Sequence, residues 1–287
     1  MVFLKKSIAY EILYLKYNYL ITLVTSIKFT HKFDYWFKKY MEEWQEGEII
    51  ENKKWTENLA SLKIKANINP HKAGQFTRLG LKHGNDLVTR SYSYASAPQD
   101  DLLEIIYVNI PNGIFSPKLH QLKRGDKISV MSQAIGYFTL DEIPEGKNLW
   151  MLATGTALGV FLSILKTTLP WKRFEKIILI HGVRYADELI YQDLISDLKN
   201  KYLNQFEYLR SVTRDSIENS FNFRIPEGFQ SSVFQKHTQI EINTDSQFMI
   251  CGNPEMIKDT TEVLKGFGLN KNRRAKPGNI TVERYWV

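Results

Sequence analysis

The chain has 287 residues, of which 43% are hydrophobic and 24% charged, as in ordinary globular proteins with one large domain or two average ones. Its single cysteine, Cys251, excludes a disulfide framework, a four-thiolate zinc site and a cysteine-bound iron–sulfur cluster. The six histidines are scattered without ligand spacing, so we expect no protein-bound metal.

The formal net charge of +7 would suit a nucleic-acid or membrane partner, but its distribution argues against nucleic acid. Residues 1–40 hold seven lysines against two acidic residues, whereas residues 41–287 hold 31 basic and 29 acidic side chains. Because the body is nearly balanced and carries no nucleic-acid motif, we exclude nucleic-acid binding.

Residues 1–40 differ from the rest of the chain, being rich in Tyr, Ile, Leu and Lys without Gly or Pro. The longest uncharged run, residues 17–27, is shorter than the roughly 20 apolar residues that span a bilayer. Neither a signal-peptide cleavage site nor a transit-peptide composition is evident. We interpret this segment as an extension outside the catalytic fold, with a membrane-surface or partner-binding leader as the alternative.

Short strands and turns alternate from residue 48 to about 142. Strands are expected at residues 59–66, 75–81, 88–94, 102–109 and 127–131. Short strands at this spacing indicate an antiparallel barrel.

The strand over residues 90–96 alternates polar and aromatic side chains. Arg90, Tyr92 and Tyr94 share one face, and Ser91, Ser93 and Ala95 share the other. It therefore offers a guanidinium group for an anion, a flat ring for stacking and a hydroxyl. Taken alone, this stretch is better explained as an edge strand with an exposed arginine.

A short helix is expected after Gly113, with Ser116 as its N-cap, Pro117 as its first residue and an end near Leu122. Free N–H groups at its start would suit a pyrophosphate, which Arg90 could close from the barrel side. An ordinary capped helix is the alternative.

The pattern changes near residue 143 to apolar runs at 148–153, 176–181, 206–213 and 247–251. Helical segments at 156–166, 187–200 and 254–266 lie between them. Alternating strands and helices predict a parallel sheet covered on both faces, with ligands at the carboxyl ends of its strands. The expected organisation is therefore an extension over residues 1–40, a barrel domain over 41–143 and an α/β domain over 144–287.

Two turns of this second half suit a nucleotide. Residues 152–160 run from a strand through Gly155 into a helix, so that a backbone close to a phosphate meets a helix N-terminus. Residues 251–256 place Asn253 as a cap and Pro254 as the first residue of another helix.

Four stretches, in order, resemble the landmarks of the ferredoxin–NADP reductase superfamily: residues 90–93, 149–159, 251–256 and 282–286. The match runs from about Met41 to the C-terminus and is most similar to the bacterial ferredoxin/flavodoxin–NADP reductases. The resemblance implies a two-domain β plus α/β fold: an FAD-binding antiparallel barrel, then a parallel-sheet NADP-binding α/β domain whose tail folds back on the flavin. The chain departs from the family at Val160, where a proline is usual.

The resemblance also implies the site residues. The FAD-binding residues would be Arg90, Ser91, Tyr92, Ser93, Ile114, Phe115, Ser116, Thr156, Tyr285 and Trp286. The NADP-binding residues would be Gly155, Thr156, Arg184, Arg214, Arg224 and Cys251. The catalytic residues would be Ser93, Cys251 and Glu283, with Cys251 positioning the nicotinamide and Glu283 relaying protons.

Charge supports NADP over NAD, because NAD-specific folds place an acid near a strand end to hold the ribose. Here Arg184, Arg214 and Arg224 follow the strands and resemble the family's clamp on the 2′-phosphate. Three solvated arginines, an inert buried Cys251 and an exposed Glu283 are the alternatives.

The implied reaction is hydride transfer from NADPH to flavin N5, followed by single-electron transfer to ferredoxin or flavodoxin. These acidic carriers would dock on a basic face, for which Lys271, Arg273, Arg274 and Lys276 are candidates. We expect a cytoplasmic monomer without a membrane span. The alternatives are a flavin or oxygenase reductase of the same fold and a non-catalytic electron-relay subunit.

Overall fold

A computed structural model of the chain describes residues 44–285. The predicted extension over residues 1–40 and the predicted FAD-binding residue Trp286 lie outside this range. Within it, no helix is long and apolar enough to cross a membrane.

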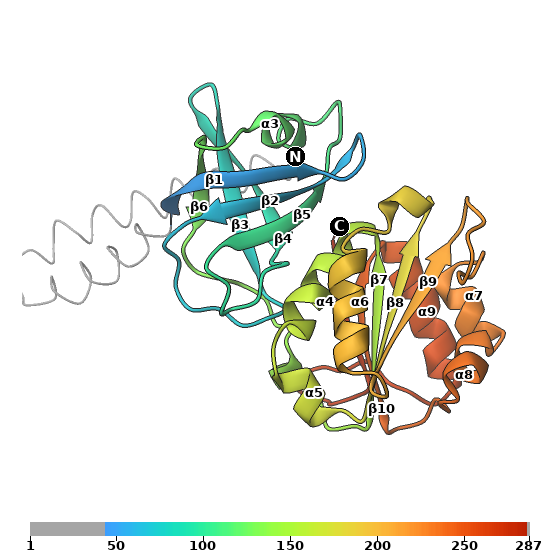
Figure 1. Ribbon diagram of the computed structural model, residues 1–287. Coiled ribbons are helices and arrows are strands. Elements are labelled where there is room, and N and C mark those ends of the chain that lie inside the picture. The colour runs from blue at the N-terminus through green and yellow to red at the C-terminus, as the bar shows by residue number, and fades with distance from the viewer. Residues whose placement is uncertain (1–43, 286–287) are drawn as a thin grey trace, which may run out of the picture. The chain divides into compact units, whose positions relative to one another are not determined.

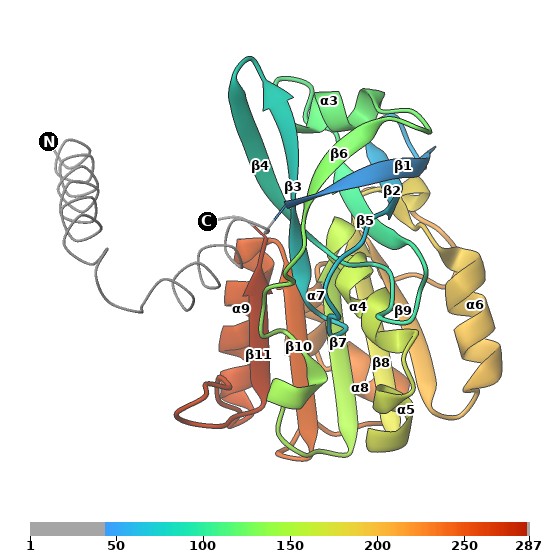
Figure 2. The same ribbon diagram turned by 90° about the vertical axis from the view of Figure 1, so that its left-hand side faces the viewer.

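The first half of the described chain is an antiparallel sheet of six strands that curls on itself (Figure 1 and Figure 2). Its strands are β1 (Trp44–Lys54), β2 (Leu59–Lys65), β3 (Phe76–His83), β4 (Asp86–Ser93), β5 (Leu103–Val108) and β6 (Lys127–Met131), in the order β4-β3-β6-β1-β2-β5. An antiparallel bridge between Tyr94 and Ile105 brings the two edge strands together. The predicted antiparallel barrel is confirmed.

Alternation along the strands builds the interior of this barrel. Leu62 and Ile64 of β2 are fully buried, while Lys65 is exposed. Tyr94 and Phe115 join the same apolar cluster, the latter from just before helix α3 (Ser116–Gln121). The strand that carries Arg90 to Ser93 and the loop that carries Ile114 are therefore each anchored in the barrel core by an aromatic residue, Tyr94 and Phe115.

The second half holds a parallel sheet of five strands. They are β7 (Asn148–Thr154), β8 (Lys176–Val183), β9 (Phe206–Val212), β10 (Ser246–Gly252) and β11 (Ile280–Arg284), in the order β11-β10-β7-β8-β9. The first four were predicted. The fifth was not, because a strand of five residues at a chain end is defined by its pairing with β10 and not by its local pattern.

Helices cover both faces of the parallel sheet (Figure 1). One face carries α4 (Leu158–Leu165), α5 (Leu169–Arg173) and α6 (Gln192–Lys201), and the other carries α7 (Ile225–Gln230), α8 (Val233–Thr238) and α9 (Pro254–Gly266). Short 3₁₀ turns, η1 (Leu140–Glu142), η2 (Gly155–Ala157) and η3 (Ala186–Glu188), complete the elements of residues 44–285. The predicted two-domain β plus α/β fold is confirmed.

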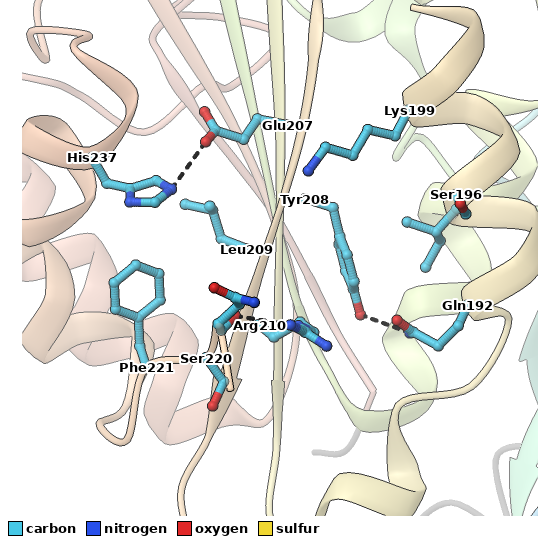
Figure 3. Close-up of a pocket in the computed structure, with 12 residues that line it drawn as sticks. Gln192, Ser196, Lys199, Glu207, Tyr208, Leu209, Arg210, Ser220, Phe221 and His237 are labelled. Atoms are coloured by element: carbon cyan, nitrogen blue, oxygen red, sulfur yellow. Dashed lines mark hydrogen bonds and ion pairs between the residues drawn. The ribbon is translucent and has the colours of Figure 1, made fainter. Parts of the chain in front are cut away.

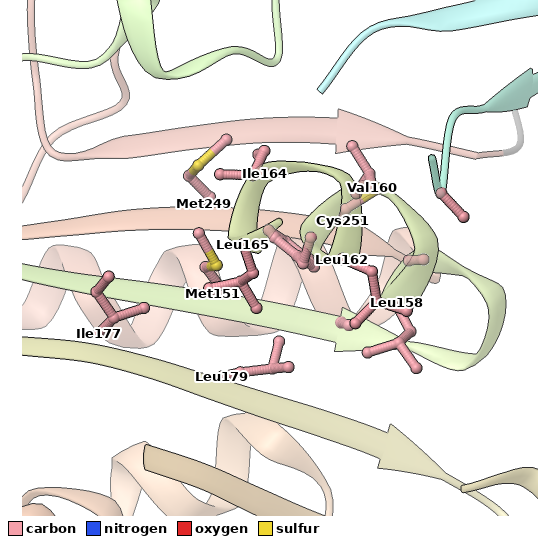
Figure 4. Close-up of a cluster of buried hydrophobic side chains, with 14 of the residues drawn as sticks. Met151, Leu158, Val160, Leu162, Ile164, Leu165, Ile177, Leu179, Met249 and Cys251 are labelled. Atoms are coloured by element: carbon pink, nitrogen blue, oxygen red, sulfur yellow. The ribbon is translucent and has the colours of Figure 1, made fainter. Parts of the chain in front are cut away.

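Successive residues of each sheet strand face opposite helical layers, as the pleat requires. Met151 and Leu179 pack with α4, as Figure 4 shows, whereas Trp150 and Ile178 pack on the α9 side. The α4 cluster also contains Ala95 and Ile106 of the barrel half, so the two halves share this apolar cluster.

Two predicted helix starts in the parallel-sheet half were wrong. The helix expected over residues 187–200 begins only at Gln192, because Tyr191 adopts a left-handed conformation with φ +59° and interrupts it. Upstream, the Glu188 carboxylate accepts hydrogen bonds from the backbone N–H groups of Arg184 (2.8 Å) and Tyr185 (3.2 Å), which holds a turn instead. The helix expected from residue 156 starts as η2 and becomes α4 at Leu158.

Candidate active site

The end of β4 lies against the last strand of the parallel sheet. The Ser93 hydroxyl lies 3.5 Å from Oε1 of Glu283, at the outer limit of a hydrogen bond. Glu283 pairs in register with Cys251 on the neighbouring strand β10. The three predicted catalytic residues are therefore brought together from three strands of both halves.

Burial governs the chemistry of this group. It raises the pKa of Glu283 to about 7, with the Ser93 hydroxyl opposing the shift. It also raises the pKa of the fully buried Cys251 thiol, and the nearby Glu283 carboxylate adds to that shift. Cys251 is thus a neutral thiol, which suits steric positioning and not nucleophilic attack.

Tyr285 packs against the apolar cluster that contains Cys251. Its own pKa is raised well above the usual value by burial and by the neighbouring thiol. The Tyr285 ring therefore covers the sulfur, and any group that is to contact Cys251 has to displace this ring.

The turn after β7 has the shape predicted for phosphate contact. Gly155 has φ +55°, is exposed, and a Cβ built on it would meet nothing within 4 Å. Left-handed conformations of this kind favour glycine, and the space above the turn admits a ligand.

The turns after β7 and β10 are tied to each other. The Asn253 N–H donates to the Thr154 hydroxyl at 2.8 Å. Gly252, with φ +132°, permits this approach, because a Cβ there would lie 2.1 Å from Thr154 Oγ1. The predicted cap on α9 is confirmed, since the Asn253 side chain accepts from the N–H groups of Glu255 (2.8 Å) and Met256 (3.2 Å).

Tyr92, one of the predicted flavin-binding residues, packs against the barrel core. The ring centroids of Tyr92 and Phe115 are 6.1 Å apart. Tyr92 is half-buried. Arg90 and Ser91 are exposed, and the Arg90 guanidinium donates to the Thr89 carbonyl at 2.8 Å.

The prediction of Ser116 as an N-cap was wrong by one residue. Phe115 is the cap residue of α3, without a side-chain cap bond, and Ser116 is the first residue of the helix. The Ser116 hydroxyl instead accepts from the Ile110 N–H at 2.9 Å and so closes the loop over residues 110–116. Ile114 at the loop's tip is 56% exposed, whereas Phe115 points into the core.

The three arginines gather at the carboxyl ends of β8 and β9. The Arg214 N–H donates to the Arg184 carbonyl at 2.8 Å, and the Ser211 hydroxyl donates to the carbonyl of Phe223, next to Arg224. All three arginines are exposed, and within residues 44–285 none forms an ion pair. Unpaired guanidinium groups at one sheet edge fit a phosphate ester.

These observations fit FAD and NADP. The half-buried Tyr92 ring offers a stacking surface beside an uncompensated Arg90, and the open Gly155 turn offers backbone at a helix start. The arginine group suits the 2′-phosphate that distinguishes NADP.

Sequence reasoning missed two residues at this site. Thr154 joins the two turns through its hydroxyl, and His181 contacts the Gly155 carbonyl through Nε2 at 3.1 Å. His181 was seen only as the end of a strand. Its contact joins residues 26 positions apart in sequence, which no local pattern reports.

Comparison with known proteins agrees with the geometry. The oxidoreductase NAD-binding domain family matches residues 151–262. Two flavodoxin/ferredoxin–NADP reductases, from Buchnera aphidicola of Schizaphis graminum and from Escherichia coli, are 42% and 40% identical, each with 86% of this chain and 100% of the relative covered. A Neisseria gonorrhoeae ferredoxin NADP⁺ reductase structure with bound FAD and NADP has a TM-score of 0.79 and 34% identity, over 85% of this chain and 99% of that one.

A curled antiparallel sheet followed by a parallel nucleotide-type sheet, with the site at their junction, defines a flavoprotein reductase. The chain belongs to the flavodoxin/ferredoxin–NADP reductase family, which confirms the resemblance drawn from its four motifs.

Proposed function

We propose that the protein is an FAD-dependent ferredoxin/flavodoxin–NADP reductase. The observation that carries the proposal is the meeting of Ser93 from the barrel with Glu283 and Cys251 from the parallel sheet. When bound, FAD and NADPH would supply the redox chemistry: the nicotinamide would reduce the flavin by a hydride, and two one-electron carriers would then take one electron each, with release of a proton.

The chain holds and orients these groups. Arg90, Ser91 and the loop residues Ile114, Phe115 and Ser116 hold the flavin pyrophosphate, and Tyr92 stacks on the ring system. Tyr285 or Trp286, the latter outside the described residues, stacks on the adenine end of the FAD. The backbone of the loop is suited to this role because the Ser116 hydroxyl closes it.

The sheet half orients the nicotinamide nucleotide. Gly155 and Thr156 approach its pyrophosphate, and Arg184, Arg214 and Arg224 hold the 2′-phosphate. Cys251 positions the nicotinamide, which requires the Tyr285 ring to move aside. Glu283, with its pKa raised to about 7, can hold or release a proton beside the Ser93 hydroxyl near neutral pH.

We further propose that an extension over residues 1–40 precedes an FAD domain over 41–143 and an NADP domain over 144–287. The protein would work as a monomer in the cytoplasm, where a lone thiol stays reduced. Lys271, Arg273 and Lys276 are exposed or half-buried candidates for docking an acidic carrier. Arg274 is a weaker candidate than its charge suggests, because Glu142 accepts two hydrogen bonds from it, at 3.0 and 3.3 Å.

The test uses the purified full chain. It should carry a yellow flavin spectrum that NADPH bleaches anaerobically much faster than NADH does, and the reduced protein should then reduce ferredoxin or flavodoxin in a salt-sensitive reaction. A colourless protein that ignores both nucleotides would refute the proposal. Preference for free flavin over either carrier would favour a flavin reductase instead.

A further inference from the structure

His181 is a fully buried histidine that the proposed reaction does not use. It lies near the carboxyl end of β8, paired in register with Ala153 of β7 and on the α4 side of the sheet. Both ring nitrogens have partners: Nε2 lies 3.1 Å from the Gly155 carbonyl oxygen, and Nδ1 lies 3.3 Å from the Tyr208 hydroxyl.

The partners fix which nitrogen carries the proton. A carbonyl oxygen can only accept, so Nε2 must be the N–H donor. Burial lowers the pKa of His181 to about 4, so the ring is neutral at physiological pH and Nδ1 is an acceptor. The Tyr208 hydroxyl therefore donates to Nδ1.

Tyr208 is supported in turn by Gln192 of α6. The Gln192 side-chain amide donates to the Tyr208 oxygen at 3.2 Å, a contact drawn in Figure 3. The hydrogen bonds thus all run in one direction, from Gln192 through Tyr208 and His181 to Gly155. Gln192 and Tyr208 also line an open hollow of about 500 Å³ at the β9 edge, so the chain of bonds begins near the surface.

The Gly155 carbonyl and the Thr156 N–H belong to one planar trans peptide, so they point in opposite directions. The carbonyl accepts from His181 on the buried side and also from the Leu158 N–H of the helix start. Holding the oxygen inward turns the Thr156 N–H outward, to the side where a phosphate would approach.

We propose that His181, as the Nε2–H tautomer fixed by Tyr208 and Gln192, is the positioning residue that orients the Gly155–Thr156 peptide toward the pyrophosphate of the nicotinamide nucleotide. The inference rests on the proposed role of this turn in NADP binding. Because NADPH and NADH share the pyrophosphate, we expect loss of His181 to weaken the binding of both nucleotides equally.

A first test reads the tautomer directly in the wild-type protein. Long-range ¹H–¹⁵N spectra of histidine-labelled protein should show one neutral ring with a protonated Nε2, unchanged between pH 6 and 8. Tyr208→Phe, which keeps the aromatic ring, should shift the Nδ1 resonance by removing its donor. If the His181 ring of the wild type carried its proton on Nδ1, or were charged, the proposal would be overturned.

A second test separates binding from turnover. His181→Leu should raise the Michaelis constants for NADPH and NADH by the same factor, about three- to tenfold for one lost hydrogen bond, with little change in kcat. His181→Gln offers an amide donor in place of Nε2 and should recover part of the loss. Tyr208→Phe should raise both constants less than His181→Leu does, and it gives a readout even if the latter does not fold.

Ile180→Ala is the matched control, since Ile180 is the fully buried neighbour on the opposite face of β8. It should lower the melting temperature without changing either Michaelis constant. Unchanged constants in folded His181→Leu or Tyr208→Phe, or equal changes in the control, would refute the positioning role. Failure of the proposed function is a separate outcome, because the wild type itself would then not be reduced by NADPH.

Discussion

The Ser93 hydroxyl and the Glu283 carboxylate lie 3.5 Å apart, although 190 positions separate them along the chain. One side chain comes from the end of β4 in the barrel and the other from β11, the edge strand of the parallel sheet. Their meeting places a hydroxyl and a carboxyl of raised pKa at the junction where the flavin and nicotinamide rings are proposed to meet.

The raised pKa of Glu283 predicts a pH-dependent stability. Folding favours its protonated form, so the resulting stabilisation is complete below about pH 4.5 and is lost as the pH rises through about 7. We expect Glu283→Gln to be more stable than the wild type above pH 7, by on the order of 1–3 kcal/mol. Urea unfolding from pH 5 to 8 measures this.

The control for that series is Glu262→Gln, which removes an exposed carboxylate paired with Lys265 at 2.8 Å. Its stability should follow the wild-type pH profile. An identical profile for Glu283→Gln would mean that Glu283 is not desolvated in solution.

Loss of Arg214, one of the three arginines proposed to bind the 2′-phosphate, should reduce the preference for NADPH over NADH. Arg214→Ala removes a guanidinium whose nearest partner is the Tyr185 hydroxyl at 3.3 Å, so little of the fold depends on it. We expect the Michaelis constant for NADPH to rise about tenfold or more, with NADH spared. Steady-state assays with both nucleotides test this, with the exposed Arg124→Ala as the control for lost positive charge. An equal rise for both nucleotides would remove Arg214 from the 2′-phosphate site.

Two glycines of the site should respond differently to alanine. Gly252→Ala forces a Cβ to 2.1 Å from Thr154 Oγ1 at φ +132°, so we expect a loss of several kcal/mol or failure to fold. Gly155→Ala meets no atom within 4 Å and should cost only about 1–2 kcal/mol for its left-handed conformation. Thermal unfolding gives both values.

Gly266→Ala completes the comparison, because Gly266 ends α9 with open space around it. It should be neutral or slightly stabilising. If Gly252→Ala unfolds no more easily than Gly155→Ala, the close approach of the two turns does not exist in solution.

The buried Cys251 should be a slow thiol. Its full burial and raised pKa predict that a disulfide reagent labels the native protein far more slowly than the unfolded chain. Tyr285→Ser should speed native labelling, because the Tyr285 ring packs on the same cluster. Phe267→Ser, which removes an exposed aromatic side chain at the end of α9, should not. Equal rates in all three proteins would show that Tyr285 does not cover the sulfur.

Features with a local cause were predictable from sequence. Alternation placed Tyr92 and Tyr94 on one face of their strand, which the structure packs on the barrel core, and the Asn253–Pro254 pair marked the start of α9 with its cap. The four motifs also gave the family, and with it the order of the two sheets.

Features with a distant cause were not predictable. β11 forms because it pairs with β10. The Ser116 hydroxyl does not cap the helix because it accepts a hydrogen bond from the Ile110 N–H, six residues earlier in the chain. The late start of α6 depends on the left-handed Tyr191, whose hydroxyl donates to Glu104 of the barrel at 2.7 Å. The contact of His181 with the Gly155 carbonyl likewise appears only when β8 lies beside β7.

Gly159 of α4 allows the helix to approach the barrel so closely that a Cβ there would lie 3.3 Å from both Ala95 and Ile106. Ser163 and Lys166 of the same helix region donate to the carbonyls of Ser96 (2.6 Å) and Ala95 (3.1 Å). The two sheets are therefore expected to melt in a single cooperative transition. Either half expressed by itself would expose the apolar surface along α4 and aggregate. An exchange of domains between relatives therefore has to keep α4 together with the barrel residues that it contacts.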